Sequence, residues 1–446
     1  MPAPAAPPGP AGSGPVPGSS GPVPGSSGPV PGSSGPGPVV IVGAGPAGAG
    51  VATELRERGY GGPITLVGKE GVPPYQRPPL SKGYLTGTTS PGELPIRPAA
   101  WYGERGIDLL TDDPARALDP HRQRVTLHSG RELPYGRLVL ATGARPRPLA
   151  VPGATLPGVL SLRSLADADA LAAALRPGGR DLLVIGGGFV GLEVAAAAHA
   201  LGWRVTVVEA GQRLLARSVS PRLSAHLAAV HQAHGVRVLT GREVVALCDT
   251  GSGRVGAFEL AGGERYAADV VVAGIGVLPE TRLAADAGLS VGDGVLVDAL
   301  LRTSDRAVYA LGDCARFPNH SAGRMTRLES VQNAADQARC VAAGLCGEPE
   351  PYRAVPWFWT EQYGLRVQIA GLTTGHDQTL VHGDVAGGRF SVFCFRAGRL
   401  VGTESVNRTA DHMITRRLLA SGAPGPRPED VARPDFDLRT HQHLAV

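Results

Sequence analysis

The sequence is poor in the residues that disulfide frameworks and membrane insertion require. Its five cysteines stand at positions 248, 314, 340, 346 and 394, and no two of them form a C-x-x-C pair. This spacing excludes a disulfide framework and favours reduced thiols in a cytoplasmic protein. No apolar run approaches the ~18 residues that a membrane span needs, so we expect no membrane partner.

Lysine is almost absent. The chain has 43 basic side chains, of which only Lys69 and Lys82 are lysines. The formal net charge of +4 is too small to indicate a nucleic-acid partner, but it suits an acidic protein partner. Hydrophobic residues make up 43% of the chain, which is typical of a globular protein, and its length of 446 residues leaves room for two or three domains.

Residues 1–37 contain no charged side chain. Within them Ser-Gly-Pro-Val-Pro-Gly-Ser recurs from Ser13, Ser20 and Ser27. Such a segment buries too little apolar surface to offset its chain entropy, so we predict a disordered tail. It lacks the basic start and apolar centre of a secretion signal.

Two glycine-rich loops are the most informative feature that is present. Each follows an apolar run, at 39–42 and at 182–185, and each precedes an alanine-rich stretch, which is the context in which G-x-G-x-x-G indicates dinucleotide binding. The first glycine permits the turn, the second admits the pyrophosphate and the third allows close packing of helix on strand. Two loops predict two dinucleotides, a bound flavin and a nicotinamide. The glycines are Gly43, Gly45 and Gly48 in the first loop and Gly186, Gly188 and Gly191 in the second.

Apolar runs alternate with helical stretches through most of the chain, which predicts an α/β fold with two Rossmann-like domains. We expect a βαβ unit from Val39 to Val67, a strand pair at 124–128 and 137–140, and a second βαβ unit that closes at Glu209. Past Pro349, short strands rich in aromatics predict a small third domain.

Five segments carry a family resemblance. They are PYQRPPLSK at 74–82, ATG at 141–143, LGD at 311–313, RLESVQNA at 327–334 and VPWFW at 355–359. Together the sequence resembles the FAD-dependent ferredoxin–NAD(+) reductases that serve putidaredoxin, rubredoxin or dioxygenase ferredoxins, within the pyridine nucleotide-disulfide oxidoreductase superfamily. The resemblance implies an FAD domain in two segments (38–152 and 279–348), an inserted NAD domain (153–278) and an α+β C-terminal interface domain (349–446).

The resemblance also implies a set of FAD contacts. In the family the pyrophosphate is held by the first glycine loop, and one acid bonds the ribose. That acid is replaced here by Lys69, so Glu70 is the substitute that we expect. Trp357 and Trp359 should cover the flavin ring, although core packing is the alternative reading for both. The implied FAD-binding residues are Gly43, Gly45, Ala47, Gly48, Glu70, Lys82, Ala115 (adenine), Arg147 (pyrophosphate), Asp313 (ribityl or phosphate oxygens), Val331 and Trp359 (the isoalloxazine).

Lys82 and Glu193 are the predicted catalytic pair. A composition that uses arginine almost everywhere has a lysine in this motif, and lysine is a compact point charge. The resemblance places Lys82 near flavin N5, with Glu193 paired to it across the domain boundary. The alternative is an ion pair with a purely structural role.

For NADH, we predict binding by Gly186, Gly188, Gly191, Glu193, Glu209 and Gly276. Glu209 ends the second strand of its unit, where a carboxylate bonds ribose hydroxyls and repels a 2′-phosphate. NADH is therefore favoured over NADPH, although Arg213 and Arg217 lie close by in the sequence.

The electron outlet follows from a missing feature. A disulfide reductase or a cysteine peroxidase needs a thiol near the first loop, and no cysteine precedes Cys248. An acidic ferredoxin that supplies an oxygenase is the expected acceptor, with Arg327 and Arg366 as docking candidates by resemblance. The rivals are an NADH oxidase or diaphorase and a redox-sensing protein like the apoptosis-inducing factors.

His226, His231 and His234 could share a helix face, which we expect to be solvated, and we predict no metal site.

Overall fold

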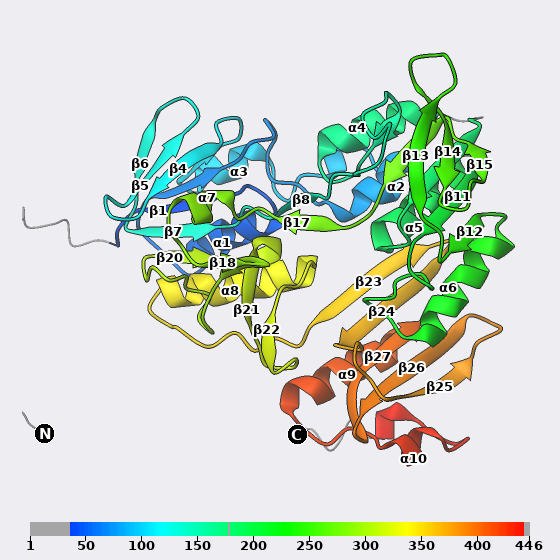
Figure 1. The fold of residues 1–446 in the computed structure, drawn as a ribbon. Coiled ribbons are helices and arrows are strands. Elements are labelled where there is room, and N and C mark those ends of the chain that lie inside the picture. Colours follow the sequence, from blue (N-terminus) through cyan, green and yellow to red (C-terminus); the bar gives the residue numbers. More distant parts are fainter. Residues whose placement is uncertain (1–35, 177–178, 441–446) are drawn as a thin grey trace, which may run out of the picture. The chain divides into compact units, whose positions relative to one another are not determined.

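The computed structural model describes residues 36–176 and 179–440. Most of the tail predicted to be disordered therefore lies outside the described residues. Within this part of the chain the helices and strands form three sheet-based units, labelled in Figure 1. None of the described helices combines the length and the apolar character required to cross a bilayer.

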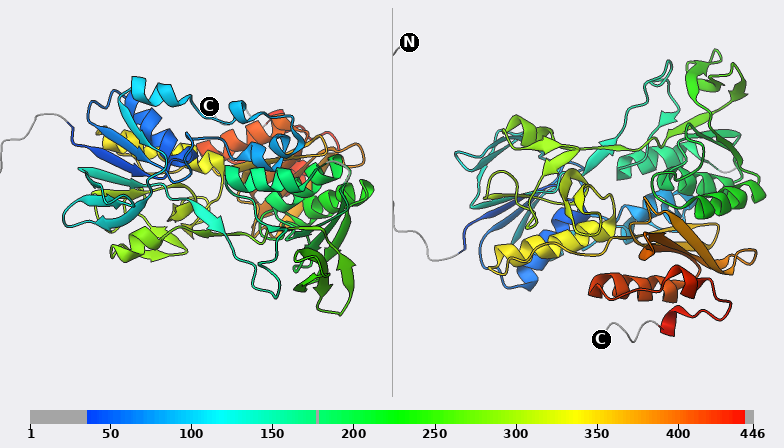
Figure 2. Two further views of the ribbon diagram at one scale, coloured as in Figure 1. Left: turned by 90° about the horizontal axis from the view of Figure 1, so that it is seen from above. Right: turned by 60° about the horizontal axis from the view of Figure 1, so that its bottom comes forward.

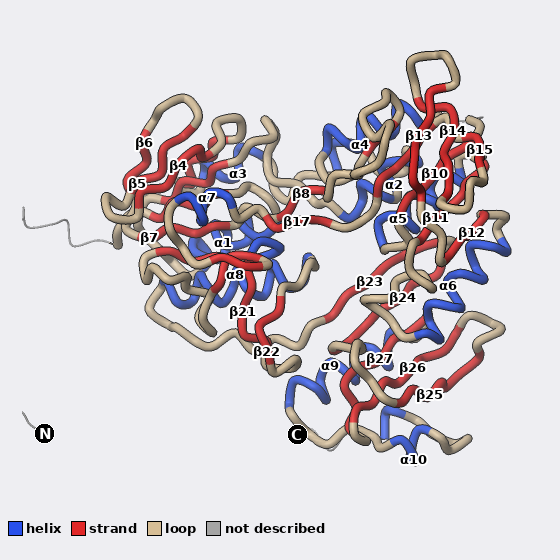
Figure 3. Tube along the Cα trace, in the orientation of Figure 1, coloured by secondary structure: helices blue, strands red, loops and turns tan. Residues whose placement is uncertain are grey.

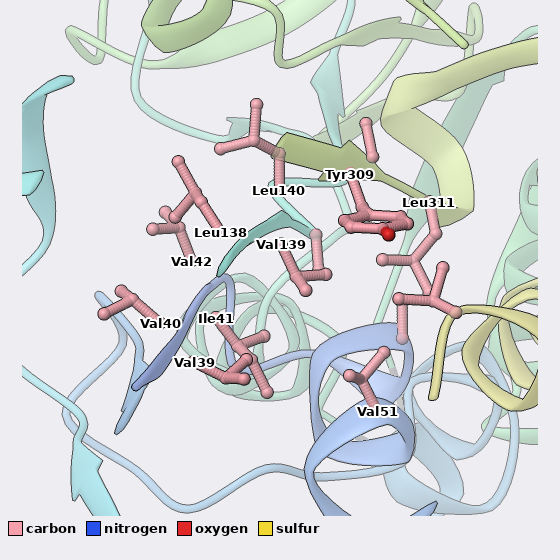
Figure 4. Close-up of a cluster of buried hydrophobic side chains, with 14 of the residues drawn as sticks. Val39, Val40, Ile41, Val42, Val51, Leu138, Val139, Leu140, Tyr309 and Leu311 are labelled. Atoms are coloured by element: carbon pink, nitrogen blue, oxygen red, sulfur yellow. The ribbon is translucent and has the colours of Figure 1, made fainter. Parts of the chain in front are cut away.

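The first unit is built on a parallel five-stranded sheet. Its strand order is β20-β7-β1-β2-β3. The buried run Val39–Val42 forms the central strand because apolar residues on both of its faces need cover from helices. Figure 4 shows these side chains packed with those of Leu138, Val139 and Leu140. The strands are β1 (Val39–Val42), β2 (Ile64–Val67), β3 (Ile107–Leu110), β7 (Arg137–Leu140) and β20 (Val308–Ala310), and the helices that pack on one another beside them are α1 (Pro46–Glu57) and α8 (Val331–Leu345).

The strand pair predicted at 124–128 and 137–140 is wrong. Residues 124–127 pair with β4 and β6 in a separate antiparallel sheet, whereas 137–140 enter the parallel sheet between β1 and β20. The burial patterns explain the separation, because β5 alternates between buried and exposed positions while β7 is buried on both faces. The small sheet consists of β4 (Ala115–Asp119), β5 (Arg124–Leu127) and β6 (Glu132–Pro134).

The second unit repeats the first. Its parallel sheet has the order β12-β11-β10-β16-β9, and β10 leads into α5 as β1 leads into α1. The strands are β9 (Val159–Leu160), β10 (Asp181–Ile185), β11 (Arg204–Glu209), β12 (Arg237–Thr240) and β16 (Val270–Ala273), with a side sheet of β13 (Val244–Asp249), β14 (Val255–Leu260) and β15 (Arg265–Ala267). The helices are α4 (Leu165–Ala174), α5 (Phe189–Ala200) and α6 (Pro221–Ala233).

Two antiparallel strands join these units. They are β8 (Ala144–Pro146) and β17 (Val277–Pro279), which pair where the chain leaves the first unit and where it returns. We propose that the domain boundaries lie close to this crossing and after α8, as the sequence indicates. The remaining elements of the first unit and its connections are η1 (Pro78–Ser81), α2 (Gly83–Thr86), η2 (Pro91–Glu93), α3 (Ala99–Glu104), α7 (Arg282–Asp286), β18 (Val291–Gly292), β19 (Gly294–Leu296), η3 (Gly312–Cys314), β21 (Ala315–Asn319) and β22 (Arg324–Thr326).

The C-terminal unit is an antiparallel sheet with the order β23-β24-β27-β26-β25, drawn as neighbouring red strands in Figure 3. Helix α9 covers one face of it, as the views in Figure 2 show. The predicted α/β fold with a smaller α+β domain is thus confirmed, although the strands of that domain are longer than we predicted. They are β23 (Trp357–Gln362), β24 (Leu365–Gly371), β25 (Gln378–Asp384), β26 (Arg389–Arg396) and β27 (Arg399–Val406), followed by α9 (Thr409–Ser421) and α10 (Pro428–Val431).

His226 and His231 of α6 and His234 at its C-terminal end do not form the solvated face predicted for them. His231 is fully buried, His226 is half-buried and only His234 is exposed. The turn between β23 and β24 covers His231, since the Tyr363 ring meets His231 edge-on and stacks on His234, while His226 meets the Phe390 ring edge-on. Sequence reasoning missed this cover because it comes from a segment far along the chain. Among the described residues, no cluster of His, Cys, Asp or Glu is placed to hold a metal ion.

Candidate functional site

A large cavity of about 2060 Å³ contains most of the predicted site. Both glycine loops line it, together with the first residues of β23 from the C-terminal unit. The predicted site residues on its wall are Gly43, Gly45, Ala47, Glu70, Lys82, Ala115, Arg147, Gly186, Gly188, Glu193, Glu209, Gly276, Asp313, Arg327, Val331 and Trp359. Gly48, Gly191 and Arg366 are not on the wall.

The glycines have the geometry that their positions in the loops require. Gly43 and Gly186 have φ angles of +117° and +103°, which side-chain-bearing residues rarely adopt. A Cβ at Gly48 would lie 1.9 Å from the Gly43 carbonyl oxygen, and one at Gly191 would lie 2.4 Å from that of Gly186. Gly48 and Gly191 therefore serve helix packing, and they act on a ligand only through the loops. Gly45 faces open space, since a Cβ added there would have no described atom within 4 Å.

The helices that follow the loops begin with N–H groups that no described side chain caps. Helices α4, α6 and α8 each start with a serine whose side chain accepts from a backbone amide. Helices α1 and α5 start at Gly45 and Gly188, and neither has an acidic residue in the first turn or a cap from any side chain in the described part of the protein. Two uncapped helix ends on one cavity fit two pyrophosphates, because these ends attract anions. The residues present thus fit FAD at the first loop and a nicotinamide dinucleotide at the second.

Lys82 and Glu193 meet where the first two units join. Lys82 Nζ lies 2.7 Å from Glu193 Oε2, and the carboxylate is only 5% exposed. Lys82 follows η1, whereas Glu193 lies on the first turns of α5, so the pair connects the two loop-bearing units. Glu193 also accepts hydrogen bonds from Ser81 Oγ at 2.5 Å and from Thr360 Oγ1 at 2.6 Å. Sequence reasoning missed Ser81 and Thr360, although Ser81 belongs to the same motif as Lys82.

Glu70 is already bonded within the protein. Its carboxylate is paired with Arg77 at 2.7 Å and accepts from the Tyr75 hydroxyl. Burial alone would raise the pKa of Glu70, but the charge and hydrogen bond of Arg77 and the Tyr75 hydroxyl outweigh burial and hold the pKa below its usual range. Both oxygens are thus engaged, so the ribose contact that we predict for Glu70 would have to share an acceptor with Tyr75 or Arg77.

Arg163 is a cation on the cavity wall that sequence reasoning missed. Its Nη2 lies 2.7 Å from Asp313 Oδ2, and its Nε donates to the Ala144 carbonyl at 3.1 Å. Arg163 precedes Ser164, the cap of α4, so it enters the cavity from the second unit while Asp313 enters from the first. Arg147 also lines the cavity, and its backbone N–H donates to the Gly276 carbonyl at 2.9 Å. Because Arg147 and Arg163 both line the cavity, their positions in the sequence alone do not tell which of them would contact the FAD pyrophosphate.

Glu209 is fixed at the end of β11. Its two oxygens accept from the backbone N–H groups of Gly187 and Gly211, each at 2.7 Å. This arrangement holds a carboxylate beside the second loop, where a ribose would lie. Arg213 donates to the carbonyls of Val219 and Ala216, so its charge is used within its own loop.

Trp357 and Trp359 both line the cavity, with ring centroids 5.5 Å apart. The guanidinium of Arg416 on α9 lies 4.5 Å from the centre of the Trp357 ring, and His412 meets the same ring edge-on. For Trp357, core packing and a position beside the flavin ring are therefore compatible, since Trp357 packs against α9 and also forms part of the cavity wall.

Acid should weaken folding through His412. Burial, reinforced by the charge of Arg416, lowers the pKa of this buried histidine from 6.5 to about 4. Because the folded pKa is the lower one, the neutral ring contributes stability above pH ~6.5 that is lost as the pH falls toward 4. When the pH falls from 7 to 5, we expect the unfolding free energy of the parent chain to drop by about 2 kcal/mol more than that of His412→Leu. Urea unfolding at both pH values measures this difference, and equal losses in both proteins would contradict it.

The two docking candidates differ in environment. The Arg327 side chain is 10% exposed and is paired with Asp293 and Glu329. It has no free charge to offer, so a docking role would require these pairs to open. Arg366 is exposed on β24, where it pairs with Glu361 at 3.0 Å. A docking role for either arginine stays a prediction.

No cysteine lies on the cavity wall. All five thiols are unpaired and all five lie within the described residues. Cys314 is adjacent to Asp313 but fully buried, and burial raises the pKa of its thiol. The wall therefore offers cationic, carboxylate and aromatic groups but no thiolate.

Comparison with known proteins identifies the family. The model of the pyridine nucleotide-disulphide oxidoreductases matches residues 37–338, and a reductase C-terminal model matches residues 357–442. Rhodocoxin reductase from Rhodococcus erythropolis is 47% identical over 403 residues, which cover 90% of this chain and 93% of that protein. Putidaredoxin reductase from Pseudomonas putida is 40% identical over 390 residues, covering 86% of this chain and 92% of the other.

Comparison with solved structures indicates the same family. The ferredoxin reductase for the CYP199A2 system from Rhodopseudomonas palustris is 44% identical with a TM-score of 0.88, covering 91% of this chain and 99% of that chain. The putidaredoxin reductase–putidaredoxin complex gives 39% identity and a TM-score of 0.89, with 92% and 99% covered. The predicted resemblance is confirmed: the chain belongs to the pyridine nucleotide-disulphide oxidoreductase family, among its ferredoxin reductases.

Proposed function

We propose that this protein is an FAD-dependent reductase that takes electrons from NADH and passes them singly to a ferredoxin that supplies an oxygenase. The observation that carries this proposal is the Lys82–Glu193 pair in a cavity with two dinucleotide loops and no thiol. A flavin disulfide reductase would need a cysteine pair at this place, so an external acceptor is the remaining outlet.

The proposal assigns a task to each group on the cavity wall. The loops of α1 and α5 would hold the pyrophosphates of FAD and NADH, and Glu209 would bind the adenosine ribose. FAD supplies the chemistry, since it accepts a hydride and can release its electrons one at a time. Lys82 would present a positive charge where negative charge develops, and Glu193 would keep that ammonium in place.

The names of the relatives support a ferredoxin partner. They include reductases of rhodocoxin, putidaredoxin and rubredoxin, and a ferredoxin reductase subunit of an O-demethylase. The mild positive charge of this chain suits an acidic partner. Five unpaired cysteines suit a reducing compartment, so we propose a cytoplasmic location.

The test of the acceptor compares electron transfer to a protein acceptor with electron transfer to oxygen. With NADH in excess, we expect rhodocoxin, putidaredoxin or rubredoxin to accelerate NADH consumption at least about tenfold over oxygen alone, because docking places the acceptor near the exit of the cavity. Stopped-flow absorbance follows the ferredoxin, and an oxygen electrode follows the competing reaction.

Two other outcomes would identify the rivals. Fast NADH consumption without any of the three proteins would indicate an oxidase or a diaphorase. A long-lived reduced complex that none of them reoxidises would indicate a redox-sensing protein like the apoptosis-inducing factors.

A further inference from the structure

A line of buried hydrogen bonds runs from Glu193 away from the cavity. Thr360 Oγ1 donates to Glu193 Oε1 at 2.6 Å, and Gln362 Nε2 donates to Thr360 Oγ1 at 3.1 Å. Gln362 Oε1 lies 2.8 Å from His231 Nε2. The line ends at Tyr363, whose hydroxyl is 3.3 Å from His231 Nδ1.

The three inner residues are closed off from water. Thr360 and His231 are fully buried, and Gln362 is 3% exposed. Thr360 and Gln362 lie two positions apart on β23, so they point to the same face of the strand. Their hydrogen-bonding partners Glu193 and His231 come from α5 and α6 of the second unit. Tyr363, in the turn after β23, also bonds His231, so the line crosses three times between the C-terminal and the second unit.

The charge of Glu193 fixes the direction of every bond in the line. A carboxylate paired with Lys82 can only accept, so the Thr360 hydroxyl must donate to it and its oxygen must accept from Gln362. The Gln362 amide then turns its oxygen to His231, which must carry its proton on Nε2. Nδ1 is left to accept from Tyr363. All four donors point toward the catalytic pair.

The surroundings of His231 favour its neutral form. Burial lowers the pKa of this histidine, His234 and His199 act in the same direction, and the Gln362 hydrogen bond opposes them. His199 on α5, His234 at the end of α6 and Tyr363 are the titratable groups that face it. A neutral ring keeps Nδ1 as the acceptor for Tyr363, whereas a charged ring would donate from both nitrogens and reverse that last bond.

We propose that Thr360, Gln362 and His231 are positioning residues for the Lys82–Glu193 pair. The relay formed by these three residues holds Glu193 Oε1, which leaves Oε2 to Lys82 Nζ and the Ser81 hydroxyl. In this way the C-terminal unit controls the orientation of a catalytic group that lies on another unit. The inference rests on the proposed function, because it takes Lys82 as the group that acts on the reacting atoms.

The relay is tested by removing one hydroxyl. In Thr360→Val, we expect the limiting rate of flavin reduction by NADH to fall about tenfold, with the NADH dissociation constant changed less than about twofold. Thr360→Ser restores the donor and should recover most of the rate. Thr403→Val is the matched control, because Thr403 is equally buried in the same sheet and its hydroxyl bonds Thr415 instead.

The rate constants of flavin reduction are measured by anaerobic stopped-flow for the parent protein and the three variants. Thermal unfolding of the holoenzyme is measured for the same proteins. A purely structural role predicts equal loss of stability in Thr360→Val and Thr403→Val with no selective loss of rate, and that result would overturn the proposal. Selective loss of rate in Thr360→Val with recovery in Thr360→Ser supports it. This comparison measures only the reduction of the flavin by NADH. It can therefore still be interpreted if no ferredoxin accepts electrons from the protein.

A second readout does not depend on activity. In ¹⁵N-histidine spectra of the holoenzyme, we expect the signal that His231→Gln removes to be that of a neutral ring protonated at Nε2. Thr360→Val frees the Gln362 amide to turn, so the tautomers should mix in that variant. A parent protein with His231 protonated at Nδ1 only, or doubly protonated at neutral pH, would refute the relay.

Discussion

Lys82→Ala is expected to reduce its bound flavin about 100-fold more slowly with NADH than the parent protein does, while FAD remains bound. One charge-stabilising group directed at developing charge is commonly worth about two to three orders of magnitude. Lys82 Nζ has the Glu193 carboxylate and the Pro78 carbonyl as its hydrogen-bonding partners, at 2.7 and 3.2 Å. The chain's other lysine, Lys69, lines the same cavity from the loop after β2, whereas Lys82 is the lysine that pairs with Glu193.

The measurement is anaerobic stopped-flow reduction over a range of NADH concentrations, with the ratio of FAD to protein taken from the visible spectrum. Glu193→Gln is the companion variant, since it keeps the shape of the side chain and removes its charge. We expect it to slow reduction by about tenfold, less than Lys82→Ala, because the ammonium remains. If Lys82→Ala destabilises the fold but reduces at the parent rate, the pair is only a structural link between units.

Glu209→Ala is expected to narrow the preference for NADH over NADPH by about tenfold or more. The carboxylate repels a 2′-phosphate and bonds a free ribose hydroxyl, so its removal should weaken NADH binding and relieve the penalty on NADPH. The fixed position of Glu209, held by Gly187 and Gly211, makes both effects large.

The ratio of kcat/KM for the two nucleotides measures this preference. Arg213→Ala is a useful comparison, because Arg213 donates to the carbonyls of Val219 and Ala216 and should act on its loop rather than on a 2′-phosphate. Unchanged discrimination in Glu209→Ala would mean that another group reads the ribose.

Features set by short segments could be predicted from the sequence. The glycine loops need only a strand, a turn and a helix in a row, and Gly43, Gly48, Gly186 and Gly191 have the close approaches that this motif demands. The partnership of Lys82 with Glu193 joins two motifs, each recognisable by itself, and the structure brings the two side chains together.

Features that depend on a third segment could not be predicted. Thr360 bonds Glu193 across 167 positions of sequence, and nothing in the run WFWTEQ distinguishes its hydroxyl from an ordinary strand threonine. The burial of His231 has the same origin, because the turn at Tyr363 covers α6. The misassigned pair at 124–128 and 137–140 shows that adjacent apolar runs reveal strands but not their partners.

The most direct test of the central claim is anaerobic titration of the purified protein with NADH, followed by addition of a ferredoxin. We expect a yellow protein whose flavin is bleached by an equimolar amount of NADH, and whose colour returns as the ferredoxin is reduced. A colourless protein that takes up no FAD, or a bleached flavin that returns its electrons only through cysteine thiols, would contradict it.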